Sequence, residues 1–167
     1  LTDTLPKPLV PVGGRPILEH ILGFLRAGGI EEVVINLHHL GARIEDAIGD
    51  GRAHGLNVRY SREPVIRDTG GGIKQAEPLL SGEPFVVANG DSLLDLALTD
   101  VLAFHRARGG LATIVVRPDA DAASYGPRRA RRLGAEAVAS ADSMPRGSAR
   151  KEPGERRQIG IAGAGGI

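Results

Sequence analysis

The sequence of 167 residues contains no cysteine and no tryptophan, and aromatic residues make up only 3% of it. The absence of cysteine excludes disulfides, zinc–thiolate sites, iron–sulfur clusters and thiol catalysis, and it suits the cytoplasm. No apolar run approaches the roughly 18 residues that a membrane span requires. The start of the sequence also lacks the charged, apolar and small-residue regions of a secretory signal. We therefore expect a globular, cytoplasmic protein.

An excess of basic charge is also missing from most of the chain. Residues 1–127 hold 12 basic and 16 acidic side chains, whereas residues 128–167 hold 9 basic and 4 acidic ones. Residues 1–127 have more acidic than basic groups, so they lack the positive charge of a surface that binds nucleic acids. The length suits one domain, and the 41% hydrophobic content is enough for a substantial core.

Apolar residues recur along the body with alternating helical and strand periodicity. Helical spacing covers residues 16–27, 40–48, 69–77 and 98–108, and short apolar runs typical of buried strands cover residues 33–37, 56–60, 85–88 and 111–116. Pro78 should end the third helix, because the residue before a proline avoids helical angles. Strands alternating with helices predict βαβ units, and hence an α/β fold with a mainly parallel sheet.

Both ends of the sequence depart from this pattern. Residues 1–10 contain two prolines, Pro6 and Pro8, with Pro11 just after them, so we expect an extended loop and no opening strand. Residues 128–157 are rich in arginine, alanine and glycine, and we expect this segment to be poorly packed. In residues 158–167 apolar and other residues alternate again, as in Ile159 and Ile161, so this segment can form a strand that returns to the core. We therefore expect a core over residues 1–127, a divergent segment and a short return.

A polar tripeptide, Asn89-Gly90-Asp91, follows the predicted strand over residues 85–88. Open α/β sheets bind their ligands at the carboxyl ends of such strands. Asp91 could hold Mg²⁺, which prefers carboxylate and phosphate oxygens, and Asn89 could bind a sugar or ribose hydroxyl. The same three residue types also favour an ordinary turn. On this segment alone, both interpretations stay open.

Two further segments could contact a nucleotide. Gly70, Gly71 and Gly72 open a predicted helix, where a backbone without Cβ atoms can approach a base or a phosphate closely. A flexible loop is the alternative there, since neither the G-x-x-x-x-G-K nor the G-x-G-x-x-G pattern is matched. Lys7 lies between two prolines on a stiff, extended backbone that could aim its ammonium group at a phosphate. The alternative for Lys7 is a solvated side chain.

Together, and in this order, the three segments resemble the sugar-1-phosphate nucleotidyltransferases over residues 1–116. Residues 2–16 look like the stretch after that family's signature loop, residues 68–74 like its base-binding turn, and residues 89–91 like its metal-binding strand end. Residues 36–40 and 63–73 look most like the bacterial N-acetylmuramate-1-phosphate uridylyltransferase branch, with the mannose-1-phosphate guanylyltransferases second.

The resemblance implies a Rossmann-like, three-layer fold and transfer of a nucleotidyl group from a nucleoside triphosphate, UTP being favoured, to a sugar-1-phosphate. It also implies a set of roles. Lys7 would contact the phosphates as a catalytic and nucleotide-binding residue, Gly70, Gly71 and Gly72 the base, Asn89 the sugar substrate, and Asp91 the Mg²⁺. No histidine base is needed, and we expect His38 and His39 to be structural or exposed.

The sequence also departs from the family. The family's opening strand and its G-x-G-T-R loop, which cradles the triphosphate, are not found, so we expect a fold that is incomplete at its N-terminus and an impaired enzyme. A later acidic residue that would complete the metal site is not located. A truncated reading, with a frame disturbance after about Tyr125, would explain both ends. The alternatives are a non-catalytic nucleotide-binding module and, less favoured because its fingerprint is missing, a nicotinamide-binding fold.

Overall fold

A computed structural model describes residues 4–65, 68–80, 84–116, 138–140 and 158–162. Residue contacts divide the chain into two units, one of residues 1–95 and 152–167 and one of residues 96–151. Every helix and strand predicted between residues 16 and 116 is present, with small differences at the ends. Most of residues 128–157, for which we expect poor packing, lie outside the described residues.

The first unit is built on a four-stranded parallel sheet in the order β4-β3-β8-β5. The strands are β3 (Glu32–Leu37), β4 (Asn57–Arg62), β5 (Phe85–Asn89) and β8 (Gln158–Ala162). β8 pairs with β3 on one side and with β5 on the other. An inner place in this sheet is therefore filled by a strand from the far end of the sequence.

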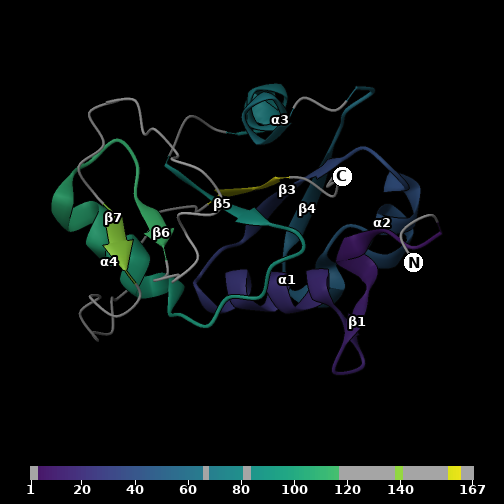
Figure 1. Ribbon diagram of the computed structural model, residues 1–167, viewed down its shortest axis with the longest axis horizontal. Coiled ribbons are helices and arrows are strands. Elements are labelled where there is room, and N and C mark those ends of the chain that lie inside the picture. Colours follow the sequence, from purple (N-terminus) through teal and green to yellow (C-terminus); the bar gives the residue numbers. More distant parts are fainter. Residues whose placement is uncertain (1–3, 66–67, 81–83, 117–137, 141–157, 163–167) are drawn as a thin grey trace, which may run out of the picture. The chain divides into compact units, whose positions relative to one another are not determined.

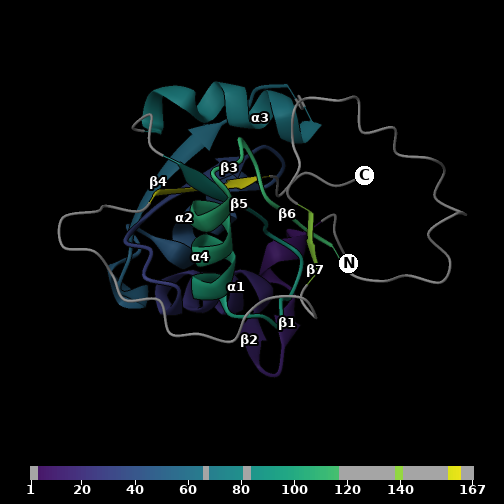
Figure 2. The same cartoon turned by 90° about the vertical axis from the view of Figure 1, so that its left-hand side faces the viewer.

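Helices α1 (Ile17–Ala27) and α3 (Asp68–Ala76) lie on opposite faces of the sheet, which gives three layers (Figures 1 and 2). On the α1 face, the buried side chains of α1 and the odd-numbered residues of β3 form the core: Leu18, Ile21, Leu22, Leu25, Val33, Ile35 and Leu37. Each fully buried leucine or isoleucine stabilises the fold by about 1.5–3 kcal/mol. Helix α2 (Gly41–Ile48) adds Ile44 and Ile48 to the buried set.

The α3 face of the sheet is polar by comparison. Arg59 on β4 donates hydrogen bonds to Leu79 O at 2.6 Å and to Glu32 Oε2 at 3.5 Å. Leu79 ends the short 3-10 helix η3 (Glu77–Leu79), which continues α3 past Pro78. Since α3 contains three consecutive glycines, each about 1 kcal/mol less favourable than alanine, the helix is weak by itself. Contacts with the rest of the fold must therefore hold it.

The N-terminal segment differs from its sequence prediction. The sequence predicts an extended backbone at Lys7, but Lys7–Leu9 form a 3-10 turn, η1, with hydrogen bonds from Leu9 N to Pro6 O and from Val10 N to Lys7 O. The φ angle of proline is compatible with such a turn as well as with an extended chain, and Pro8 is buried in it. The turn fixes the backbone of Lys7 more firmly than an extended loop would.

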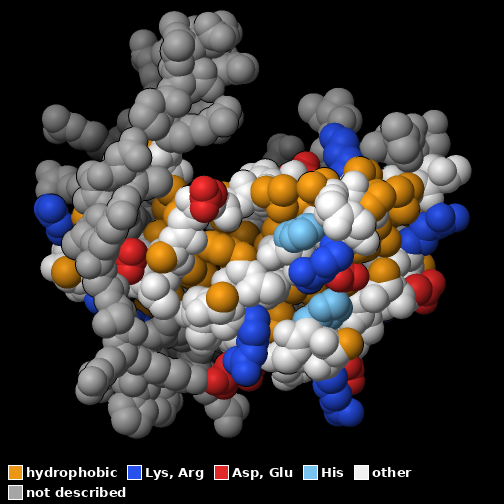
Figure 3. Space-filling model, turned by 90° about the horizontal axis from the view of Figure 1, so that it is seen from below, with side chains coloured by type: hydrophobic (Ala, Val, Ile, Leu, Met, Phe, Trp, Pro, Cys, Tyr) orange, Lys and Arg blue, Asp and Glu red, His pale blue; other side chains and the backbone are white. Residues whose placement is uncertain are grey.

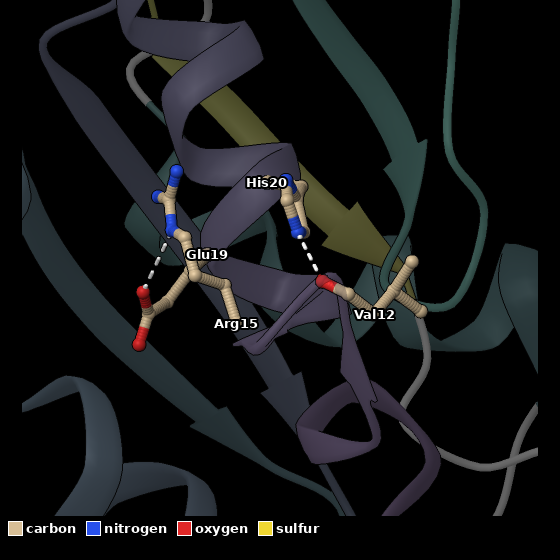
Figure 4. A network of polar contacts seen from close by, with 4 residues as sticks. All are labelled: Val12, Arg15, Glu19 and His20. Atoms are coloured by element: carbon tan, nitrogen blue, oxygen red, sulfur yellow. Dashed lines mark hydrogen bonds and ion pairs between the residues drawn. The ribbon is translucent and has the colours of Figure 1, made fainter.

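A small hairpin of β1 (Pro11–Val12) and β2 (Arg15–Pro16) connects η1 to α1. Its two central glycines have positive φ, as a two-residue hairpin turn of type I′ requires. Figure 4 shows how α1 fixes this hairpin: His20 Nε2 donates to Val12 O at 2.9 Å, and Arg15 pairs with Glu19. The hairpin therefore holds the segment before it against α1.

Strand β5 is less buried than its apolar sequence predicts. Phe85 and Val87 are each 41% exposed, because β5 is the edge strand of the described sheet. An edge strand with exposed apolar side chains favours association between molecules. In the second unit, α4 (Leu98–Arg108) is followed by β6 (Ile114–Val116), which pairs with β7 (Val138–Ser140), and His105 contacts Thr113 Oγ1.

We expect the stability of the fold to fall between about pH 10 and about pH 12 because of Tyr60. Its hydroxyl donates to Gly49 O at 2.7 Å. Burial, with the carboxylates of Glu45 and Asp50, raises the pKa of Tyr60 to about 12. In the unfolded chain the hydroxyl ionises near its usual pKa of about 10, so the stability it contributes is complete below that pH and is lost above it.

Urea unfolding midpoints of the wild type and of Tyr60→Phe, compared at about pH 8 and about pH 11, measure this effect. The wild type should lose more stability than the variant between the two conditions. Equal losses would contradict the role of Tyr60.

Candidate functional site

The carboxyl edge of the parallel sheet gathers the polar residues that the sequence singles out. Asn89 is the last residue of β5 and pairs in register with Ala162 of β8, and Gly90 and Asp91 follow as a turn. Asn89 and Asp91 are exposed, whereas Gly90 is buried. Ser92 Oγ donates to Asp91 Oδ1 at 3.4 Å. The amide and the carboxylate are therefore open to a ligand.

The three glycines lie inside the first half of α3, which begins at Asp68 near the same edge. Gly70 is exposed and Gly72 is buried, and Gly72 contacts Asn36, the penultimate residue of β3. Strands β3 and β5 are separated by β8, so they lie two strand spacings, about 10 Å, apart. The glycine segment and Asp91 thus border one stretch of the edge.

Lys7 belongs to the same side of the molecule. The carboxyl end of helix α1 connects to the amino end of strand β3. The amino end of α1 therefore lies toward the carboxyl edge of the sheet, and η1 and the hairpin precede that end of the helix. Ile17 N, the first helical amide, donates to Val10 O at 3.0 Å. Figure 1 shows this N-terminal segment on the side toward which β5 and β8 point. Lys7 is partly buried and makes contacts of its own.

The two histidines after β3 behave as the sequence analysis expects. His38 is exposed and donates from Nδ1 to Glu63 O at 2.7 Å, which joins the ends of β3 and β4, and His39 is exposed. Leu40, which follows them, adopts a left-handed φ of 54°, an unusual angle for a residue with a side chain. These residues shape the carboxyl edge of the sheet.

Sequence reasoning missed a buried polar cluster under α3. It consists of the buried side chains of Asn36 and Ser61, which are 5% and 6% exposed, and of the half-buried Glu63, next to Gly72. Among the described residues, Asn36 Oδ1 is one of two buried side-chain atoms without a hydrogen-bond partner. An asparagine within the apolar run of residues 33–37 was the signal that could have revealed it.

The residues present fit a Mg²⁺ ion that is shared with phosphates. Within the described residues, no three histidine or acidic side chains come close enough together to hold a metal by themselves. Mg²⁺ often binds through one or two carboxylates, with waters and substrate phosphates completing its shell. The exposed Asp91 carboxylate has the chemistry that such a ligand needs.

Charges of both signs are interspersed on the face that carries α1 (Figure 3). This mixed face agrees with the charge balance of residues 1–127. None of the helices in the described ranges is long and apolar enough to cross a membrane.

Comparison with known proteins decides the family. The model of the family described as nucleotidyl transferase matches residues 1–139. This chain belongs to the nucleotidyl transferase family. The family resemblance carried by residues 2–16, 68–74 and 89–91 is thereby confirmed.

Several curated members of the nucleotidyl transferase family are similar in sequence. N-acetylmuramate alpha-1-phosphate uridylyltransferase of Neisseria meningitidis is 53% identical over 100 residues, which cover 59% of this chain and 43% of that protein. UTP–glucose-1-phosphate uridylyltransferase of Synechocystis is 34% identical and mannose-1-phosphate guanylyltransferase of Mycobacterium tuberculosis 36% identical, each over 75% of this chain and 36% and 35% of the relative. The chain thus spans less than half the length of these relatives.

A solved structure supports the fold. A protein described as a glucose-1-phosphate thymidylyltransferase of Bacillus anthracis superimposes with a TM-score of 0.67, at 18% identity, over 72% of this chain and 49% of that one. The α/β nucleotidyltransferase fold with a mainly parallel sheet is therefore confirmed.

Proposed function

We propose that this chain carries the nucleotide-binding part of an enzyme that transfers a nucleotidyl group from UTP to a sugar-1-phosphate and releases pyrophosphate. The observation that carries the proposal is the 53% identity with a uridylyltransferase that acts on a sugar-1-phosphate, over 100 residues. The guanylyltransferase of M. tuberculosis reaches 36%, which favours UTP over GTP. The cytoplasm suits such a chain, because it has no cysteine to oxidise.

Each site residue has a role in this proposal. Lys7 binds the phosphates of the nucleotide, Gly70, Gly71 and Gly72 contact the base, and Asn89 binds a hydroxyl of the sugar substrate. Asp91 holds Mg²⁺, which when bound spreads the negative charge of the phosphates.

The reaction requires positioning more than proton transfer. A phosphate oxygen of the sugar-1-phosphate attacks the α-phosphorus of UTP, and a new phosphorus–oxygen bond forms. The bond from the α-phosphorus to the oxygen that bridges it to the β-phosphate breaks, and pyrophosphate leaves. The attacking oxygen is already an anion, so no base is needed, and Lys7 stabilises the charge that develops on the phosphates.

Gly71→Val should raise the KM for UTP. A β-branched side chain at this position would occupy the space that the base needs and would stiffen the turn. Steady-state kinetics with varied UTP measure the effect, and the KM for the sugar-1-phosphate serves as the internal control. An unchanged KM for UTP would leave Gly71 with a structural role only.

Pyrophosphate release tests the proposed function. Purified protein is assayed with UTP, GTP, dTTP and ATP, each with and without a panel of sugar-1-phosphates. We expect release that needs both substrates and is fastest with UTP. We also expect low turnover from residues 1–167 assayed alone, because the G-x-G-T-R loop of the family is not among them, and faster turnover once upstream residues are added. Nucleotide binding without release in either form would favour the binding module.

A further inference from the structure

Helix α3 is held on the sheet by polar contacts. Gln75 Nε2 donates to Arg62 O at 2.5 Å, and Arg59 donates to Leu79 O just after the helix. The helix also lies next to β3 and β8. Hydrogen bonds are directional, whereas apolar contacts are not. These hydrogen bonds therefore hold the helix on the sheet and also fix its position along the strands.

Gly72 is the point of closest approach between α3 and the sheet. A Cβ atom on Gly72 would lie 2.5 Å from Glu63 Oε1 and closer still to Asn36 Nδ2, nearer than real Cβ atoms come to other atoms. Around Gly70, by contrast, no atom lies within 4 Å of such a Cβ. The two glycines therefore differ: a side chain at position 72 would have to displace Asn36 and Glu63, whereas one at position 70 would meet no atom within 4 Å.

The buried side chain of Asn36 does not stabilise the fold as well as an apolar side chain would. Its side chain is 5% exposed, and its Oδ1 atom is buried without a partner. An unsatisfied buried acceptor destabilises a fold, and an apolar side chain of the same shape would avoid that penalty. An asparagine at this position points to a task other than stabilising the core.

We propose that Asn36 and Glu63 are positioning residues for the nucleotide site. They form a polar seat for Gly72, and the seat fixes where the glycine-bearing half of α3 lies at the carboxyl edge of the sheet. The proposal rests on the proposed function, because it takes residues 70–72 as contacts of the nucleotide. His38 supports the seat by its hydrogen bond to Glu63 O, which joins the ends of β3 and β4.

A double-mutant cycle on Gly72 and Asn36 tests the seat by thermal unfolding. Gly72→Ala should lower the Tm by a few degrees despite the better helix propensity of alanine, whereas Gly70→Ala should raise it slightly. In the Asn36→Ala background the added Cβ gains room, so Gly72→Ala should cost less there than in the wild type. Equal shifts for Gly70→Ala and Gly72→Ala, together with additive effects in the cycle, would overturn the seat.

UTP binding separates positioning from a merely structural role. Asn36→Ala and the better-filling Asn36→Leu should weaken the Kd for UTP about tenfold or more, because small misplacements of a site are costly. Asn36→Leu should do so without lowering the Tm. The matched control is Ser61→Ala, which removes a buried polar group at the paired position of β4. Its Kd should equal that of the wild type.

Amide hydrogen exchange over Ile73–Ala76 completes the test. Exchange should be faster in both Asn36 variants and unchanged in Ser61→Ala. Wild-type affinity and wild-type exchange in the Asn36 variants would overturn the positioning role. If the wild type itself binds no UTP, the proposed function fails, and the unfolding cycle and the exchange rates still decide whether the seat exists.

Discussion

Deletion of residues 158–167 is expected to abolish the cooperative unfolding of the first unit. β8 pairs with β3 over residues 32–35 and with β5 over residues 85–89, so its removal breaks two ladders at once. The backbone groups of both neighbours would lose their partners, and an unpaired buried group costs about as much as a lost hydrogen bond. The β3–β4 pair and the single strand β5 would remain, with exposed edges that favour aggregation.

Thermal unfolding followed by circular dichroism, together with sedimentation, measures this loss. The wild type should unfold cooperatively below roughly 60 °C, since the edge strand β5 exposes apolar side chains. Deletion of residues 163–167 alone keeps β8 and is the matched control. If the deletion of residues 158–167 unfolds at the same temperature as the chain of residues 1–167, β8 is dispensable.

Asp91→Asn and Lys7→Ala are expected to lower turnover by a factor on the order of 10²–10³, which is typical of losing one preorganised electrostatic contact. Asp91→Asn keeps the shape of the side chain but removes the charge that would hold Mg²⁺. Asp91 is exposed and contributes little to packing, so folding should be unaffected. The assay uses a form of the chain that is active in pyrophosphate release.

Mg²⁺ dependence distinguishes the two variants. High Mg²⁺ should recover part of the activity of Asp91→Asn, because mass action offsets a weaker metal site, and should not recover Lys7→Ala. Unfolding curves of both variants serve as the control for stability. If Asp91→Asn keeps full turnover with unaltered Mg²⁺ dependence, residues 89–91 are only a turn.

The elements of the sheet and its helices could be predicted from apolar periodicity. Leu18, Leu22 and Leu25 mark one face of α1, and the β-branched run of β3 marks a strand buried on both faces. β8 was foreseen only as a possible returning strand. Its place between β3 and β5 depends on pairing across more than 60 residues of sequence, about which local periodicity carries no information.

The candidate site could be predicted in part for a similar reason. Asp91 follows a recognisable strand, so its position at the carboxyl edge could be derived from the parallel topology. The turn at Lys7 could not, because proline fits both a 3-10 turn and an extended chain. The seat of Asn36 and Glu63 under Gly72 joins three segments that are distant in sequence, and only tertiary packing brings them together.

An NMR titration with UTP and Mg²⁺ tests most directly whether the glycine segment and the strand end form one nucleotide site. The amide signals of residues 70–72 and 90–92 should shift together, in one saturable step with a single Kd. Those of Ile21, Leu22 and Leu25 in the core of α1 should stay in place. Shifts confined to one of the two segments, or two different Kd values, would contradict a shared site at the carboxyl edge of the sheet.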